Sequence, residues 1–415
     1  MTGTPRRTAL HPVHEALGAR FTDFGGWDMP LKYANELDEH RAVRERVGVF
    51  DLSHMGEVRV TGPDAAAFLD HALISRLSAV KVGKAKYSMI CTEDGGIIDD
   101  LITYHLAENE FLVIPNAGNA PTVAAALAER AAGFDVTVAD ESADTALIAV
   151  QGPDAAAVMR EIVAEVTDAP EASGAGRTVD AAVEGLGYYA AFRGRVAGHD
   201  AVVARTGYTG EDGFEIFVAN PGAADVWEAA LAAGERFDVL PCGLASRDTL
   251  RLEAGMPLYG HELSLDLTPV DAGLGVLAAT SSKEEFVGRD AIVAAKEQGT
   301  RQRLIGLTGE GRRAAREGYD VYVAGTDEKL GTVTSGALSP TLGHPVAMAY
   351  VSSEAAAEGG AAAEGTGVEV DVRGRRLPFT VTALPFYSRG RRRPGPAGPP
   401  TPPGRGGRGD TARPT

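Results

Sequence analysis

Apolar and polar side chains alternate in many short segments of this chain, and segments with helical spacing separate them. One such segment runs from Phe214 to Val218 and follows a glycine-rich turn. Because successive side chains of a strand point to opposite faces, Glu215 and Phe217 share one face. The other face is wholly apolar and carries Phe214, Ile216 and Val218. The pattern predicts a β-strand that presents a single carboxylate among apolar neighbours.

A second apolar segment has turn residues at its centre and predicts a hairpin over 84–104. Its second strand carries two adjacent acids, Asp99 and Asp100, which must point to opposite faces. Strict alternation places Asp100 on a face with Ile98, Ile102 and Tyr104. It places Asp99 on the other face with Ile97, Leu101 and Thr103.

The sequence Gly-Pro-Asp-Ala-Ala-Ala occurs twice, at 62–67 and at 152–157. Each copy follows a β-rich segment and precedes a segment with helical character. Proline is well placed early in a helix, and an acid there suits the positive end of the helix. The repeat, with its matched flanks, predicts two related α+β subdomains.

The remaining pattern predicts helices over 8–18, 35–47, 120–132, 223–234, 244–254 and up to 297, with Asn35 as an N-cap. Residues 21–33 are rich in glycine and aromatic side chains and predict an ordered loop, and 173–184 predicts a surface segment. The composition changes near 280–283, and six short alternating strands follow between 302 and 381. These strands predict a small β-barrel or sandwich.

Length and composition limit the classes of protein that the chain can belong to. A chain of 415 residues is long enough for two or three domains, and 44% hydrophobic with 23% charged residues is typical of a globular protein. No apolar run of about 18 residues predicts a membrane span. Two cysteines, Cys91 and Cys242, cannot form a disulfide framework, so we expect both to be buried and the protein to be cytoplasmic.

The formal net charge of -17 is unevenly distributed. Seven arginines and one acid after residue 388 make that end basic, and the rest of the chain carries about -23 by the same counting. An acidic body argues against nucleic acid as a partner. The Pro/Gly/Arg composition of 394–415 predicts a disordered tail.

Two interpretations of Glu215 are open from the pattern alone. A lone carboxylate on an apolar strand is typical of a solvent-facing or edge position. It is also typical of a ligand site, because its two oxygens accept a pair of N–H groups such as those of a pterin, a purine or a guanidinium. Tyr208, in the turn that precedes the strand, is placed to provide a flat wall for such a ring.

The adjacent acids also have two interpretations. Either Asp99 and Asp100 serve a turn and a neighbouring loop, or one of them lies in a cavity where burial and hydrogen-bonding partners tune its pKa. His40 and His54 belong to no motif for nucleophilic catalysis, zinc or phosphate binding. We therefore expect structural roles for both histidines.

Several motifs resemble those of the aminomethyltransferase, or T-protein, family of the glycine cleavage system. They are Ser-His-Met-Gly at 53–56, Gly-Gly-Ile-Ile-Asp-Asp at 95–100, and the segments 205–215, 243–255, 258–260 and 286–288. They occur in the order that the family shows, from about Thr8 to about Arg389. Only the basic tail lies outside this resemblance.

The resemblance implies an α+β fold, in which two interleaved α+β domains of ferredoxin-like or Greek-key type and a C-terminal β-barrel surround tetrahydrofolate like a cloverleaf. It implies a folate-binding region over 1–282, made of one subdomain from about 1–50 with 140–282 and one from about 51–139. The barrel covers 283–388, and 389–415 is the disordered tail.

The resemblance also implies a reaction and a set of site residues. The aminomethyl group on the lipoyl arm of H-protein is passed to tetrahydrofolate, giving 5,10-methylenetetrahydrofolate, ammonia and dihydrolipoyl-H-protein, without a metal and without a membrane or nucleic-acid partner. The family's catalytic aspartate corresponds to Asp100. Its folate pocket corresponds to Met55, Tyr87, Asn116, Tyr208, Glu215 and Arg247.

Two alternatives share the fold, and fold alone does not determine function. One is a folate-dependent demethylase or the folate domain of a sarcosine- or dimethylglycine-type oxidase, which usually carries an additional flavin domain. The other is a folate-binding iron–sulfur assembly factor. That group has a Lys-Gly-Cys-type loop where this chain has Arg-Thr-Gly-Tyr at 205–208.

Overall fold

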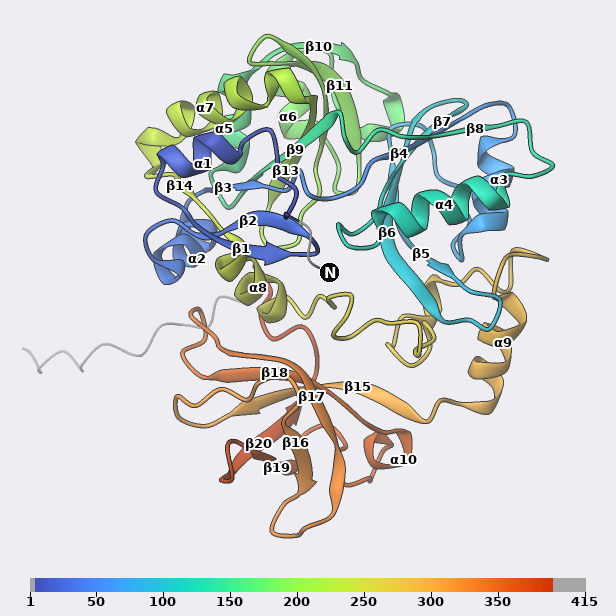
Figure 1. Cartoon of the computed structure of the whole chain (residues 1–415), viewed down its shortest axis with the longest axis vertical. Helices are drawn as coiled ribbons and strands as arrows, with labels where there is room; N and C mark the ends of the chain where they lie inside the picture. The colour runs from blue at the N-terminus through green and yellow to red at the C-terminus, as the bar shows by residue number, and fades with distance from the viewer. Residues whose placement is uncertain (1–3, 391–415) are drawn as a thin grey trace, which may run out of the picture.

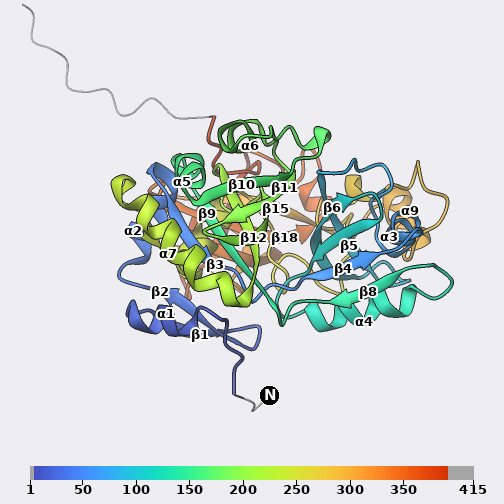
Figure 2. The same ribbon diagram turned by 90° about the horizontal axis from the view of Figure 1, so that it is seen from above.

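Two open sheets and one closed barrel form the three lobes of the protein (Figure 1). The computed structural model describes residues 4–390, and the predicted tail beyond them lies outside the described residues. Helix α8 (Leu244–Glu253) lies where the lobes meet. Seen from above, the two open sheets lie side by side (Figure 2). The predicted α+β cloverleaf with a C-terminal barrel is confirmed.

The first lobe is built on a seven-stranded sheet in the order β10-β11-β12-β13-β9-β3-β14. Its apolar face packs under helices, and Phe214, Ile216 and Val218 share one core cluster with Trp227, as alternation predicts. The elements are β3 (Gly48–Asp51), β9 (Thr145–Gln151), β10 (Val163–Asp168), β11 (Ala191–Val196), β12 (His199–Ala204), β13 (Gly213–Ala219), β14 (Leu240–Pro241), α1 (His11–Ala16), α2 (Glu36–Glu45), α5 (Ala155–Ile162), α6 (Val179–Gly185) and α7 (Ala223–Gly234).

Residues 21–33 form a hairpin rather than the predicted loop. Strands β1 (Arg20–Phe24) and β2 (Trp27–Lys32) pair antiparallel around Gly25 and Gly26. Both glycines have positive φ, +59° and +82°, which a tight two-residue hairpin turn requires and glycine adopts without strain. The Gly-Gly pair was therefore the hairpin signal that the loop prediction overlooked.

The second lobe is a five-stranded sheet in the order β5-β6-β7-β4-β8, covered by two helices. The predicted 84–104 hairpin is present as β5 and β6. The elements are β4 (Val58–Thr61), β5 (Ala85–Cys91), β6 (Ile97–Ala107), β7 (Glu110–Ile114), β8 (Thr137–Asp140), α3 (Ala65–Ala72) and α4 (Ala120–Arg130).

Strand β6 contains a bulge that changes part of the predicted alternation. The pairing with β5 shifts register opposite Ile97 and Ile98, where one extra residue is inserted. Ile98 consequently packs in the same cluster as Leu101, and Ile97 packs in a different one. The prediction that Ile98 shares a face with Asp100 is therefore wrong, whereas Ile102 keeps its predicted face.

The two Gly-Pro-Asp repeats have the same structure. Gly62 precedes α3 and Gly152 precedes α5, with φ of +132° and +129°. A side chain at Gly62 would meet the carbonyl oxygen of Asp135 at 2.4 Å, and one at Gly152 would meet that of Arg46 at 2.5 Å. Each glycine therefore allows the strand-to-helix connection to pass close to a neighbouring backbone.

The third lobe is a closed six-stranded barrel in the order β15-β18-β17-β16-β19-β20, so the barrel alternative is confirmed over the sandwich. None of the helices described between residues 4 and 390 is long and apolar enough to span a bilayer. The elements are α9 (Arg289–Gln298), β15 (Gln302–Gly309), β16 (Asp320–Val323), β17 (Lys329–Leu338), β18 (Pro345–Ser352), α10 (Ser353–Ala356), β19 (Gly367–Asp371) and β20 (Arg376–Thr382).

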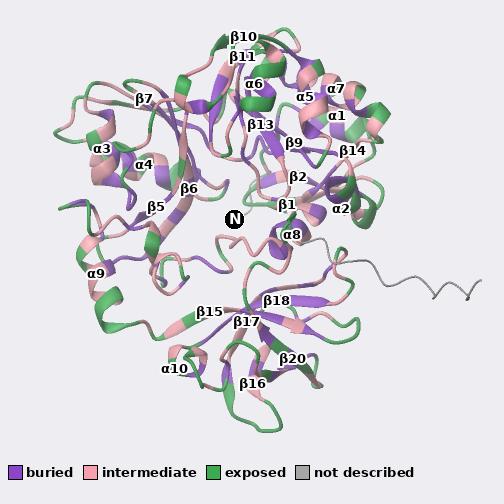
Figure 3. Ribbon diagram, turned by 180° about the vertical axis from the view of Figure 1, so that it is seen from behind, coloured by how far each residue is buried: buried purple, intermediate pink, exposed green. Residues whose placement is uncertain are grey.

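Buried positions follow the strands and the inner faces of the helices, and exposed positions lie on the outer helix faces and loops (Figure 3). A polar network is also buried between the lobes. Glu253 on α8 accepts hydrogen bonds from Arg44 on α2 at 2.9 Å, from Ser339 after β17 at 2.5 Å and from Thr341 at 2.7 Å. His40 on α2 lies between two threonines of this network, so its predicted structural role is confirmed.

After β20 the chain returns to this network through the C-terminal segment, residues 383–390. Tyr387 donates its backbone N–H to the carbonyl of Glu253 at 2.8 Å and its hydroxyl to the carboxylate of Glu211 at 2.5 Å. The guanidinium of Arg44 lies over the Tyr387 ring at 4.0 Å. Because Glu211 belongs to the turn before β13, the C-terminal segment holds that turn in place.

A chain that ends at Arg389 should match the full-length protein in melting temperature and turnover, because it keeps every contact of Tyr387. A chain that ends at Leu384 should melt about 3–6 °C lower, since it loses a charge-assisted hydrogen bond and the ring packing. Thermal denaturation and turnover of both truncations test this. A large loss for the Arg389 variant would show that residues beyond it pack on the body.

Candidate active site

An inner pocket of about 200 Å³ lies between the two open sheets, beneath α8. Strands β6 and β13 provide its two carboxylates, and α8 and the turn before β13 close it. All seven site residues predicted from the sequence line it: Met55, Tyr87, Asp100, Asn116, Tyr208, Glu215 and Arg247. The structure thus brings together residues that are up to 192 positions apart in the chain.

Asp100 faces this pocket from β6 and is held by two donors. The hydroxyl of Tyr87 donates to one carboxylate oxygen at 2.9 Å, and the side-chain amide of Asn116 donates to the other at 2.8 Å. Burial raises the pKa of Asp100, and the two donors oppose that rise because they favour the ionised form. The carboxylate is therefore fixed in position and orientation.

Asp99 points to the opposite face of β6 and does not line the inner pocket. It accepts hydrogen bonds from the backbone N–H of Asn116 at 2.8 Å, from the Asn116 side chain at 2.9 Å and from Asn119 at 2.7 Å. Burial, and then the charge of Asp100, raise the pKa of Asp99 to about 7. Asp99 therefore orders the loop after β7 and places Asn116 beside Asp100.

Glu215 is only 8% exposed, although it is a carboxylate on a strand. Its strand, β13, lies inside the sheet between β12 and β9, so the solvent-facing or edge interpretation is wrong. One carboxylate oxygen, Oε2, accepts hydrogen bonds from the hydroxyls of Tyr104, at 3.3 Å, and Thr206. Burial raises the pKa of Glu215, and Thr206 and the nearby Arg247 oppose that rise. Within residues 4–390, Oε1 has no hydrogen-bond partner and remains available to a ligand.

Arg247 extends from α8 over the ring of Tyr208, with the guanidinium carbon 4.7 Å from the ring centre. Tyr208 is fixed in turn by a hydrogen bond from its hydroxyl to the carbonyl of Pro257. No described residue between 4 and 390 pairs with the Arg247 guanidinium, and burial lowers its pKa. This half-buried cation stacks on Tyr208 but lacks an acceptor among the described residues, which a ligand could supply.

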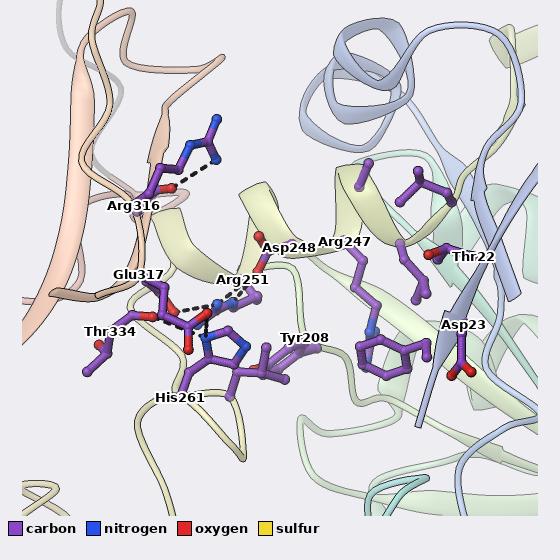
Figure 4. Close-up of a pocket in the computed structure, with 17 residues that line it drawn as sticks. Thr22, Asp23, Tyr208, Arg247, Asp248, Arg251, His261, Arg316, Glu317 and Thr334 are labelled. Atoms are coloured by element: carbon purple, nitrogen blue, oxygen red, sulfur yellow. Dashed lines mark hydrogen bonds and ion pairs between the residues drawn. The ribbon is translucent and has the colours of Figure 1, made fainter. Parts of the chain in front are cut away.

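An outer cleft of about 610 Å³ adjoins the inner pocket. The residues that line both are Phe24, Tyr208, Arg247 and Leu258. In Figure 4, α8 forms the roof of this cleft, the β1–β2 hairpin carries Asp23 on one side, and the barrel carries Arg316 on the other. A ligand with a flat head and a longer tail could therefore place the head in the inner pocket and the tail in the cleft.

His54 also lines the inner pocket, which sequence reasoning missed. It is 2% exposed, and the ring of Phe24 lies edge-on to it at 5.5 Å. Nothing in the local sequence shows this environment, because Phe24 comes from the hairpin that was predicted as a loop. The one indication in the sequence that His54 lies at the pocket is its position next to Met55, a predicted pocket residue.

The pocket combines two fixed carboxylates, aromatic walls and a guanidinium that no described acceptor between residues 4 and 390 bonds. Asp100 and Glu215 suit a ligand with several N–H donors, and Arg247 suits an acceptor on the same ligand. Glu215 is buried, Asp100 is half-buried, and both are held by hydrogen bonds, which is an arrangement that stabilises a positive charge as it develops. These groups lie together in one pocket at the junction of the three lobes.

Comparison with known proteins identifies the family. The sequence profile of the GCVT N-terminal domain matches residues 10–282, and that of the glycine cleavage T-protein C-terminal barrel domain matches 302–388. An aminomethyltransferase of Corynebacterium jeikeium is 72% identical over 384 residues, covering 92% of this chain and 98% of that protein. One of Streptomyces avermitilis is 53% identical over 94% of this chain and 99% of that protein.

A solved structure agrees with these relatives. The crystal structure of the glycine cleavage system aminomethyltransferase T from Bartonella henselae has a TM-score of 0.80 and 36% identity, covering 92% of this chain and 98% of that one. The chain therefore belongs to the glycine cleavage T-protein family of aminomethyltransferases. The relatives favour this assignment over both alternatives considered from the sequence.

Proposed function

We propose that the inner pocket binds tetrahydrofolate and that Asp100 assists transfer of a one-carbon unit to it from aminomethyl-lipoyl-H-protein. The observation that carries the proposal is the pair of carboxylates, half-buried Asp100 and buried Glu215, which line one pocket with Arg247. A reduced pterin presents adjacent N–H donors and a carbonyl acceptor. That pattern matches the free oxygen of Glu215 and the guanidinium of Arg247.

The chemistry requires stabilisation of positive charge. Two folate nitrogens each form a bond to the methylene carbon, while the bonds of that carbon to the amino nitrogen and to the lipoyl sulfur break. Each folate nitrogen loses one proton, and the two protons end on the departing ammonia and on the lipoyl thiol. An iminium-like cation develops at the methylene during this exchange. Asp100, held by Tyr87 and Asn116, stabilises that cation and orients the nucleophile without forming a covalent bond.

The other residues bind the co-substrate. Glu215 holds the pterin N–H groups, Tyr208 forms a flat wall, and Arg247 binds an acceptor at the junction with the outer cleft. Met55 contributes apolar contact. We expect a reducing cytoplasm as the setting, because both cysteines are free and buried.

The direct test mixes the protein with tetrahydrofolate and aminomethyl-lipoylated H-protein and measures methylenetetrahydrofolate and ammonia. We expect both products, and neither when H-protein is omitted. A parallel reaction supplies sarcosine or dimethylglycine in place of H-protein. Transfer of a methyl group from those amines to tetrahydrofolate would favour the demethylase alternative and reject the proposal.

A further inference from the structure

Five histidines are buried in the part of the chain that the structure describes, and four of them are hydrogen-bonded. Their partners are a carboxylate, a hydroxyl or a backbone carbonyl: Asp28 for His11, Asp51 for His14, Thr249 and Thr341 for His40, and the carbonyl of Val80 for His105. His54 is the fifth. Among residues 4–390 neither nitrogen of its ring has a partner, and Nδ1 is shielded from solvent.

A buried polar group without a partner destabilises the folded state, so each case needs an explanation. The position of His54 suggests one, because its ring lines the inner pocket between Met55 and the Phe24 ring. Burial, and then the charge of Arg247, lower the pKa of His54 to about 4. The imidazole is therefore neutral at pH 7 and offers one N–H donor and one nitrogen acceptor.

We propose that His54 is a further folate-binding residue, whose imidazole forms a hydrogen bond with the ligand in the inner pocket. The ring is left unpaired in the free protein and gains its partner when the ligand binds. Phe24 packs edge-on against the ring, and burial and the charge of Arg247 keep it uncharged, so it pairs with a neutral group of the ligand. This inference rests on the proposed binding of tetrahydrofolate.

Replacing His54 separates this role from simple packing, because the two make opposite predictions for stability. The variant His54→Leu fills similar space and removes the unpaired nitrogens, so its melting temperature without ligand should not fall. Its affinity for tetrahydrofolate should fall by about 5- to 20-fold, since the ligand loses one hydrogen bond. The variant His54→Gln keeps a donor and an acceptor near Nε2 and should retain affinity within about threefold.

The matched control is His40→Leu, a buried histidine outside the pocket that has partners. It should melt lower, because two threonine hydroxyls lose their partner, and it should bind tetrahydrofolate as the wild type does. Calorimetric titration with tetrahydrofolate and thermal denaturation without ligand measure both quantities for all variants.

Three results would overturn the inference. Unchanged affinity of His54→Leu would show that the ring does not contact the ligand. A parallel fall of affinity and melting temperature in His54→Leu would show that the ring supports the pocket wall by packing. A wild-type protein that does not bind tetrahydrofolate would reject the proposed function together with this inference, whereas the first two results leave the proposed function intact.

Discussion

Replacing Asp100 with asparagine should lower turnover by about 100- to 1,000-fold and leave folate affinity close to that of the wild type. Asparagine keeps the size of the side chain and can still accept a hydrogen bond from Tyr87 or Asn116, but it removes the negative charge. A positioned charge that faces a developing cation contributes roughly 3–4 kcal/mol, judged by the loss of one oxyanion-hole donor. Folate binding changes little, because the charge acts mainly on the transition state.

The matched control is Asp99→Asn, on the opposite face of the same strand. Asp99 accepts three hydrogen bonds from Asn116 and Asn119, so its replacement turns one acceptor into a donor that faces other donors. We expect a lower melting temperature and a milder loss of turnover. Steady-state turnover and folate affinity of both variants test which of the two aspartates is catalytic. An inactive Asp99→Asn beside a fully active Asp100→Asn would show that the catalytic assignment is wrong.

Glu215→Gln should weaken folate binding by about 30- to 150-fold. Thr206 and Tyr104 donate to Oε2 of Glu215 and hold that oxygen. In glutamine the oxygen takes this position, and the new amide group then faces the N–H donors of the ligand. Losing a charge-assisted bond and leaving buried donors unpaired costs roughly 2–3 kcal/mol, and 1.4 kcal/mol corresponds to about tenfold in affinity.

Calorimetry against tetrahydrofolate measures this effect, and Glu57→Gln provides the comparison. Glu57 is another fully buried glutamate, but it lines a groove on β4 and lacks any contact with the inner pocket. Its replacement should leave folate affinity unchanged. Near-native affinity of Glu215→Gln would mean that the carboxylate does not bind the ligand.

Local pattern predicted those parts of the site that depend on strand alternation. The two faces of β13 follow from its sequence, and they place Glu215 opposite the apolar core. The seven site residues came from family motifs, and the structure gathers them in one pocket, although their roles remain predictions. Burial of Glu215 was not predictable, because it depends on β12 and β9 pairing on either side of its strand.

The features that were missed depend on contacts between distant segments. Alternation fails at Ile98 because pairing with β5 inserts a bulge that the sequence of β6 alone does not show. A structural role is expected for His54 because it belongs to no motif, and the Phe24 ring that packs against it lies 30 residues away in the chain. The local pattern of apolar and polar residues carries no information about such contacts.

Tyr387 has a consequence for the order in which the protein assembles. A chain is synthesised from its N-terminus, and domains that emerge early fold first. Both open sheets are complete by Pro241, whereas the turn before β13 gains its tether to Tyr387 only after the barrel has emerged. A nascent chain on the ribosome therefore carries the pocket residues before the contact of Tyr387 with this turn can form. A product that terminates before Tyr387 would keep the walls of the pocket and lack one of the contacts that fix its turn.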